Sequence, residues 1–275
     1  MAVKVQENFI PKRNLANYPL KGINIPAREV SGDFFSFYPH NELIYFIIAD
    51  VAGKGIHAGM VMAKASTLFE VLAQDKVDLD EMTFYMNNDL FNTKTGGMFV
   101  TGIVGKYNII SEEVSWVNAG HQPALIRDSK GFFKDFESKS PPLGVIKQKN
   151  KLAYFLNKEK LNGKRFYAFT DGLSESLNLN LEELGIEGAK EIINNNYNSN
   201  LEVELNSVSK EVINNSKKNV RYLWDTIKDD YHCAHLKIDG LFELNKIPFF
   251  MKLKDFSFDG ETAIEMETKI STKNN

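Results

Sequence analysis

The sequence predicts an α+β protein in which helices cover a sandwich of two mainly antiparallel sheets. Two observations lead to this class. Apolar and polar residues alternate through several short segments in the middle of the chain, which is the pattern of antiparallel strands with one buried face. Segments with helical periodicity stand before and after this run, so the order differs from the regular strand–helix alternation of a dinucleotide-binding fold.

The first third of the chain predicts a short N-terminal helix, two strands and two helices. The apolar run LIYFII leads into Asp50 and a glycine turn, which is typical of a buried strand. The next segment is rich in small and apolar residues and has no proline, so we expect a largely buried helix. The predicted elements are a helix within residues 1–20, strands at 22–25 and 43–50, and helices at 56–73 and from Asp78 or Asp80 to residue 92.

From residue 98 the hydrophobic period falls to two, and the remaining elements are mostly strands. The segments MFVTGIVGKYNII, EVSWVNAG, PALIRD and GFFKDFE predict an antiparallel meander with short turns. KLAYFL and KRFYAFTDG predict two further strands. Two helices at 181–196 and 201–216 and a closing strand at DDYHCAHLKID complete the pattern, while residues 240–275 are ambiguous and end in a polar tail.

Composition excludes several classes of protein. The 275 residues are 43% hydrophobic and 25% charged, and the formal net charge of −3 gives no basic surface for nucleic acid. No run approaches the ~20 apolar residues of a membrane span, and the first residues lack the apolar core of a signal peptide. A single cysteine, Cys233, excludes an intramolecular disulfide and fits a reducing compartment. These properties predict a cytoplasmic protein without a membrane span or a nucleic-acid partner.

Aspartates recur at the ends of the predicted strands. They are Asp33 in SGDFF, Asp50 after IYFIIA, Asp171 in FYAFTDG, and Asp229 and Asp230 at the start of DDYHCAHLKI. If these strands are neighbours, the carboxylates converge and repel one another, and a hard divalent cation such as Mg²⁺ or Mn²⁺ would relieve the repulsion. Aspartate after a strand is also common in turns and at helix N-caps, so the spacing alone leaves both interpretations open.

The order of the motifs carries more information than any one of them. SGDFF, IIADVAGKGIHAGMVMAKA, FVTGIVGKYN, VSWVNAGHQPALI, PPLGV, FYAFTDGLSES and DDYHCAHLKI stand in the order seen in the SpoIIE-like bacterial branch of the PPM (type 2C) protein phosphatases. The chain resembles this family from about Val5 to Asp239. The resemblance implies a four-layer α-β-β-α sandwich, phosphoserine/phosphothreonine phosphatase activity and a site for two divalent cations, Mn²⁺ or Mg²⁺.

The resemblance also implies a role for individual residues. Asp50 would bridge the two cations, and a water that they activate would attack phosphorus directly. The implied metal ligands are Asp33, Asp50, the Val51 carbonyl, Asp171 and Asp229, with Asp230 as the alternative to Asp229.

Three further residues have candidate roles near this site. Arg28 stands where the wider class has a phosphate-binding arginine, and a guanidinium fork suits a phosphoryl group; the alternative is a surface arginine beside Glu29. Lys54 lies by the metal turn and is a candidate substrate contact, although exposed loop lysines are more often only solvated. His121 in NAGHQP is expected to make a structural hydrogen bond at a turn.

The resemblance divides the chain into an N-terminal helix or linker at 1–20, a phosphatase domain at 21–239 and a C-terminal extension of unknown role at 240–275. In this branch the substrate is often a phosphorylated STAS-type anti-anti-sigma protein in a partner-switching pathway. An upstream sensor domain or regulator and a homodimer are further expected partners.

Two other functions remain open at this point. A catalytically weak or inactive module with the same fold could present residues 56–92 to a signalling partner. A metal-dependent hydrolase of small phosphate esters is the other. Metal-dependent turnover separates the first alternative from an enzyme, and comparison of phosphopeptides with small esters tests the second.

Overall fold

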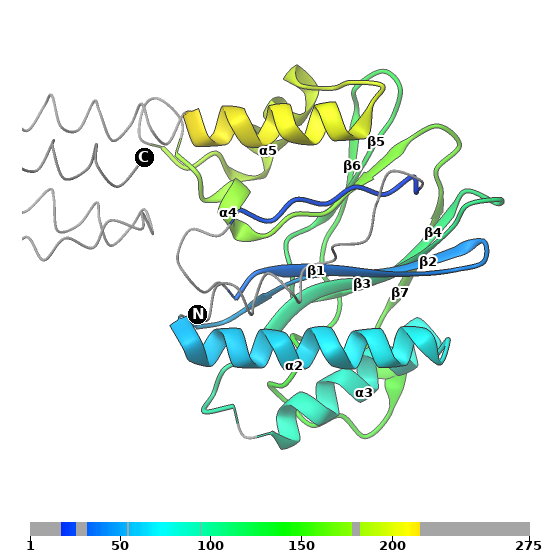
Figure 1. Ribbon diagram of the computed structural model, residues 1–275, viewed down its shortest axis with the longest axis vertical. Coiled ribbons are helices and arrows are strands. Elements are labelled where there is room, and N and C mark those ends of the chain that lie inside the picture. Colours follow the sequence, from blue (N-terminus) through cyan, green and yellow to red (C-terminus); the bar gives the residue numbers. More distant parts are fainter. Residues whose placement is uncertain (1–17, 26–31, 54, 94, 178–181, 215–275) are drawn as a thin grey trace, which may run out of the picture. The chain divides into compact units, whose positions relative to one another are not determined.

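Two antiparallel sheets face each other, and helices lie on their outer sides (Figure 1). The computed structural model describes residues 18–25, 32–53, 55–93, 95–177 and 182–214. The predicted strand at 229–239 and the extension at 240–275 lie outside the described residues, as does most of the predicted N-terminal helix. The four-layer α-β-β-α class predicted from the sequence is confirmed.

The larger sheet, sheet A, has five strands in the order β1-β2-β3-β4-β7. All of its neighbouring strands are antiparallel, and Asp50 in β2 stands opposite Thr101 in β3. The strands are β1 (Phe34–His40), β2 (Leu43–Val51), β3 (Val100–Asn108), β4 (Glu113–Ala119) and β7 (Leu156–Lys160). The prediction of a buried strand that ends near Asp50 is confirmed.

The smaller sheet, sheet B, has three described strands in the order β6-β5-β8. They are β5 (Ala124–Arg127), β6 (Phe133–Phe136) and β8 (Arg165–Tyr167). The predicted continuous meander is therefore wrong at one point: β4 belongs to sheet A and β5 to sheet B, so the chain changes sheets through residues 120–123. The two strands do not pair with each other, because this short connection crosses the sandwich at its edge instead of closing a hairpin.

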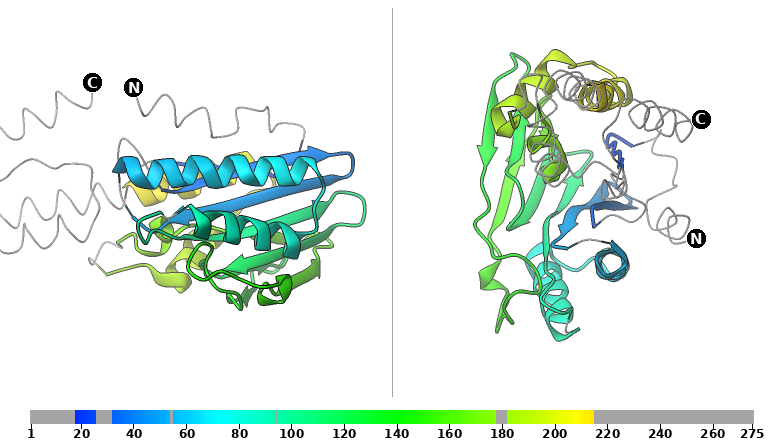
Figure 2. Two further views of the ribbon diagram at one scale, coloured as in Figure 1. Left: turned by 90° about the horizontal axis from the view of Figure 1, so that it is seen from below. Right: turned by 90° about the vertical axis from the view of Figure 1, so that its left-hand side faces the viewer.

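The two faces of the sandwich are covered by different helices (Figure 2). Two long helices lie on sheet A, and the later helices lie on the side of sheet B (Figure 1). The elements are α2 (Gly55–Gln74), α3 (Leu79–Asn92), the 3₁₀ turn η2 (Lys151–Ala153), α4 (Asp171–Ser174) and α5 (Gly185–Asn195), followed by a helical segment at 201–214. The predictions of the helices at 56–73 and from Asp78 are confirmed.

Alternation along the strands sends side chains into three apolar layers. Tyr45, Ile47 and Ala49 of β2 face α2 and α3, while Ile44 and Phe46 face sheet B. Between the sheets, the Trp116 ring is fully buried and meets two phenylalanines of sheet B edge-on at centroid distances of 5.0 and 5.1 Å. The third layer joins β5 to α5. Burial in these layers supplies the main stabilisation of the sandwich.

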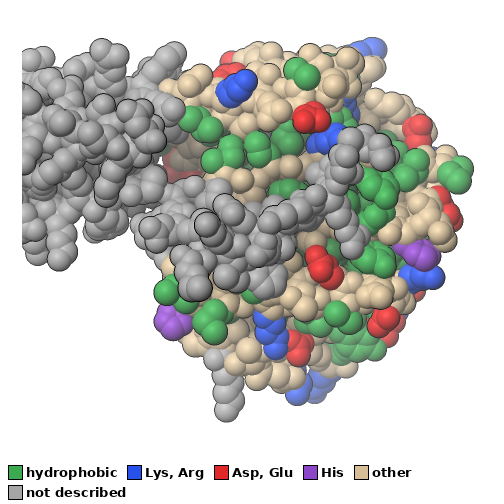
Figure 3. Space-filling model, in the orientation of Figure 1, with side chains coloured by type: hydrophobic (Ala, Val, Ile, Leu, Met, Phe, Trp, Pro, Cys, Tyr) green, Lys and Arg blue, Asp and Glu red, His purple; other side chains and the backbone are tan. Residues whose placement is uncertain are grey.

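Helix α2 is long and apolar enough to meet length and composition criteria for a membrane span, but 44% of its most apolar window is buried inside the fold. Its buried side chains, among them Met62 and Phe69, lie in the layer against sheet A. The burial of this face is that of a helix packed on the core of the fold. On the face drawn in Figure 3, basic and acidic side chains of the described residues are interspersed among apolar ones.

Two local predictions are wrong. Residues 22–25 are described without strand structure. The predicted strand KLAYFL is instead the turn η2 and an approach to β7, which begins at Leu156. Its apolar residues are not a buried strand face, because Leu152 is 86% exposed and Phe155 is 49% exposed. The strand itself is the polar segment LNKEK, which is placed by pairing with β4.

Candidate metal centre

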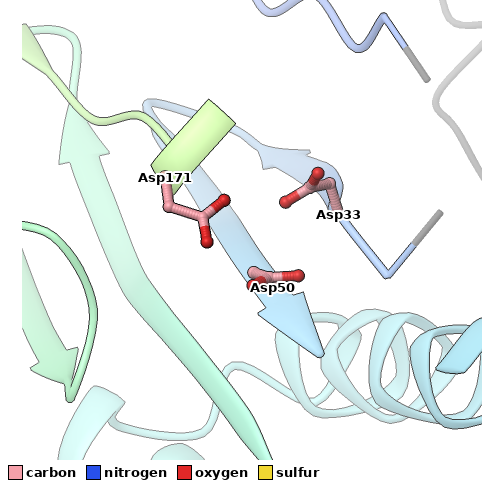
Figure 4. A group of neighbouring side chains, drawn as sticks. All are labelled: Asp33, Asp50 and Asp171. Atoms are coloured by element: carbon pink, nitrogen blue, oxygen red, sulfur yellow. The ribbon is translucent and has the colours of Figure 1, made fainter. Parts of the chain in front are cut away.

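Three aspartates from distant parts of the sequence meet at one edge of the sandwich. Carboxylate oxygens of Asp33, Asp50 and Asp171 all lie within 4.8 Å of one another, and all three residues are partly buried. Figure 4 shows the three side chains converging from the start of β1, the end of β2 and the start of α4. The convergence that the sequence could only assume is present for these three residues.

Asp33 and Asp50 are brought together by the β1–β2 pair. Phe34, directly after Asp33, stands opposite Ala49, directly before Asp50. Gly32 fits closely here: a Cβ on it would lie 2.8 Å from the Val51 carbonyl oxygen and 3.2 Å from Asp50 Oδ1. Glycine thus lets the backbone before Asp33 approach the end of β2.

Asp171 reaches the same edge from the other sheet. The chain leaves β8, buries Phe169 in the layer under α5, and begins α4 at Asp171. The Asp171 carbonyl accepts a hydrogen bond from the Glu175 backbone N–H at 2.7 Å and one from Ser174 Oγ at 3.3 Å. The short helical turn therefore fixes the backbone that carries the carboxylate.

The donor set suits a hard divalent cation. Three carboxylates at this separation repel one another, and a cation with a preference for oxygen ligands would relieve that repulsion. Magnesium and manganese are such cations. The Val51 carbonyl lies against Gly32 at the same edge, and its role as a ligand stays a prediction. Four predicted site residues lie outside the described residues: Arg28, Lys54, Asp229 and Asp230.

His121 is a neighbour of this centre that the sequence analysis assigned only to a turn. It is 7% exposed, and its Nδ1 lies 2.9 Å from Thr101 Oγ1. Burial lowers the pKa of His121 to about 4, although the Asp171 carboxylate and the Phe169 carbonyl both favour the protonated ring. The ring is therefore neutral at pH 7. The sequence could indicate His121 only as a histidine in the connection between two strands. That the ring lies near the Phe169–Asp171 segment as well as near Thr101 is visible only in the fold.

Comparison with known proteins finds a matching family model and several relatives. The model of the family described as "Stage II sporulation protein E (SpoIIE)" matches residues 41–230. The phosphoserine phosphatase RsbU of Bacillus subtilis (strain 168) is 27% identical over 194 residues, which cover 66% of this chain and 57% of RsbU. The chain thus spans little more than half the length of this relative.

Two solved structures show the same fold. The SiaA-PP2C domain of Pseudomonas aeruginosa aligns with a TM-score of 0.66 at 14% identity, covering 78% of this chain and 87% of that one. The PP2C phosphatase domain of SpoIIE from Bacillus subtilis, solved with a fragment of its regulatory domain, aligns with a TM-score of 0.56 at 17% identity and covers 69% of this chain and 55% of that one. At these identities the likeness concerns the fold.

Proposed function

Because the chain belongs to the SpoIIE family, we propose that it is a metal-dependent phosphoserine/phosphothreonine protein phosphatase. The observation that carries this proposal is the meeting of Asp33, Asp50 and Asp171 at one edge of the sandwich. Three partly buried carboxylates within 4.8 Å of one another have an evident chemical use as cation ligands. The names of the relatives agree with this class of enzyme.

In this proposal the three aspartates hold two divalent cations, Mn²⁺ or Mg²⁺, with the Val51 carbonyl and Asp229 or Asp230 completing the ligand set. When bound, such cations would lower the pKa of a water and would neutralise charge on the phosphoryl oxygens, which is the chemistry that direct attack of water on phosphorus requires. The protein contributes rigid placement. Asp50 is fixed by pairing of β2 on both sides, and Asp33 by the close approach of Gly32. Arg28 is proposed to bind the substrate phosphate and Lys54 to contact the substrate.

Hydrolysis of p-nitrophenyl phosphate and of a phosphoserine peptide, with and without Mn²⁺, tests the proposal. We expect Mn²⁺-dependent turnover that falls at least about 100-fold in Asp50→Asn, because the amide keeps the shape but removes the charge that holds the cations. Asp75→Asn is the matched control, since Asp75 is exposed and follows the far end of α2, about 30 Å along the helix from its start. No turnover by the wild type at high enzyme concentration would favour an inactive module that binds a partner.

We propose further that the substrate is a phosphorylated STAS-type anti-anti-sigma protein and that the enzyme works in the cytoplasm. Support comes from the family and from relatives that are named as phosphoserine phosphatases. An upstream sensor or regulator and a homodimer belong to the same proposal. Faster hydrolysis of the phosphorylated STAS protein than of a phosphopeptide of the same sequence would support it. Preference for small esters would point instead to a hydrolase of small molecules.

A further inference from the structure

His121 occupies the point where the chain passes from sheet A to sheet B. It lies between the end of β4 at Ala119 and the start of β5 at Ala124, close to the edge that carries the three aspartates. Its side chain is buried, and its ring is flanked by groups from both sheets. A rigid side chain in this position can set the distance between the two sheets at the metal edge.

The backbone around His121 is fixed by several independent contacts. Asn118 Oδ1 accepts the His121 backbone N–H at 2.8 Å, and Asn118 Nδ2 donates to the Gln122 carbonyl at 2.9 Å. Gly120 has φ +69°, and a Cβ on it would lie 2.5 Å from Pro142 Cγ. Ser138 Oγ accepts the Gly120 N–H at 2.8 Å. These contacts fix the backbone of Gly120, His121 and Gln122, and so they fix the point from which the imidazole projects.

On the sheet A side, the ring contacts the strand that positions Asp50. Nδ1 lies 2.9 Å from Thr101 Oγ1, and Thr101 is the residue of β3 that stands directly opposite Asp50 in β2. Any movement of the ring relative to Thr101 therefore acts on the strand pair that carries Asp50.

On the sheet B side, His121 lies beside the segment that carries Asp171. β5 pairs antiparallel with β8, with Leu125 opposite Tyr167, so the residues before β5 and those after β8 leave the sheet at the same end. The Phe169 carbonyl and the Asp171 carboxylate both influence the imidazole. Nε2 is buried and has no hydrogen-bond partner among the described residues. The Phe169 carbonyl is therefore a close neighbour of the ring and not a bonded acceptor.

From these two sides we expect the tautomer with the proton on Nε2. A neutral imidazole has one N–H and one acceptor nitrogen. If Thr101 Oγ1 donates to Nδ1, the proton is on Nε2 and points toward oxygen atoms of the Phe169–Asp171 segment, which is attractive. The opposite tautomer would aim the Nε2 lone pair at those oxygens, which is repulsive.

We propose that His121 is a positioning residue for the metal centre, which couples the Asp50-bearing strands of sheet A to the Asp171-bearing turn after sheet B. The inference rests on the proposed metal-dependent function. His121 acts through Thr101 on one side and through the Phe169–Asp171 segment on the other. Its loss lets the two sheets separate at this edge, and the carboxylates then bind cations less well.

The test is Mn²⁺ affinity of the full chain, measured by isothermal titration calorimetry with Thr101→Val. Valine keeps a β-branched side chain of similar size but removes the hydroxyl. We expect the dissociation constant to rise about tenfold or more, which is the effect of losing a residue that orients metal ligands. Thr101→Ser keeps the hydroxyl and should bind Mn²⁺ as the wild type does.

Thr101→Val, His121→Gln and the variant that carries both substitutions form a double-mutant cycle with the wild type. If the two residues act through one contact, the combined loss of affinity should be much smaller than the product of the single losses. Nitrogen-15 NMR of the imidazole in the metal-free protein should show the proton on Nε2. A proton on Nδ1 would contradict the inference.

The outcomes separate the two proposals. If the wild type binds Mn²⁺ and Thr101→Val binds it equally well while unfolding at a lower temperature, the contact supports only the fold and the inference is wrong. If the wild type binds no Mn²⁺, the proposed function fails together with the inference. Should His121→Gln fold poorly, the two Thr101 variants still decide the question.

Discussion

Replacing Gly120 with alanine should destabilise the protein far more than the same change at another glycine with similar backbone geometry. Gly120 has φ +69°, and an added Cβ would lie 2.5 Å from Pro142 Cγ and 3.0 Å from the Pro142 backbone nitrogen. Because a proline ring is rigid and its nitrogen belongs to the backbone, the clash cannot be relieved by a rotamer change. Gly163 has φ +79°, but a Cβ there would meet nothing within 4 Å.

The expected magnitudes follow from these two environments. Left-handed backbone costs an alanine about 1–2 kcal/mol at either position. Overpacking against Pro142 adds about 1–3 kcal/mol at Gly120 alone. Gly120→Ala should therefore lower the free energy of unfolding by about 2–5 kcal/mol, and Gly163→Ala by about 1–2 kcal/mol. The smaller conformational entropy of the unfolded alanine chain affects both variants and cancels in the comparison.

Urea unfolding followed by tryptophan fluorescence measures both variants, since Trp116, one of the two tryptophans, is buried between the sheets. Equal destabilisation by the two substitutions would show that the crossover adjusts freely around Pro142. That result would refute the claim that residues 120–123 are held rigidly and would weaken the positioning role given to His121.

Two further predictions concern buried polar groups. Glu204 is 3% exposed and accepts hydrogen bonds from Arg165 and from the Tyr167 hydroxyl. Glu204→Ala should therefore lower the free energy of unfolding in urea by about 3–5 kcal/mol, whereas Glu159→Ala, which breaks a surface ion pair, should lower it by less than about 1 kcal/mol. Similar losses in the two variants would contradict the structure. In the folded protein the pKa of His121 is about 4, below the ordinary value of 6.5. Acid therefore protonates His121 in the unfolded chain first. The free energy of unfolding is highest above pH 6.5 and falls as the pH is lowered through 4. In chelator-treated protein this loss should approach ~3 kcal/mol and be absent from His121→Gln; an unchanged pH profile in the variant would contradict it.

The elements with strong periodicity could be predicted from the sequence alone. LIYFII is buried on both faces, against α2 on one side and sheet B on the other, so its continuous apolar run was an adequate signal. Helix α2 was predictable because its segment is rich in small and apolar residues and contains no proline. For β2 the local pattern and the tertiary environment agree. For α2 the helix is confirmed, but the expectation that it is largely buried is wrong, because Ile56, Met60 and Val71 are at least half exposed.

The partners of the strands could not be predicted in the same way. β4 and β5 each carry an apolar pattern typical of a strand, and the four residues between them are compatible with a hairpin as well as with a change of sheet. The fold shows that the two strands belong to different sheets, and Trp116 of β4 packs across the core in one cluster with Ala124 and Ile126 of β5. The polar strand β7 was missed because pairing with β4, and not its own composition, makes it a strand.

The candidate site shows the same division. The position of an aspartate at the end of a strand is a local property, and the sequence predicts it for Asp33 and Asp50. The sequence predicts Asp171 at a strand end as well, but β8 ends at Tyr167 and Asp171 is the first residue of α4. The convergence of the three aspartates depends on how sheet B stacks on sheet A, which no local pattern encodes. The family resemblance supplied that information, and the distances within the cluster agree with it.

The origin of the three carboxylates has a consequence for folding. Asp33 and Asp50 belong to one hairpin and can approach each other early, whereas Asp171 arrives only when sheet B has docked on sheet A. A cation that needs all three ligands would bind the docked state alone. Its binding energy would then add to the cooperativity of the whole sandwich, and the melting temperature of the domain would rise with the concentration of free metal.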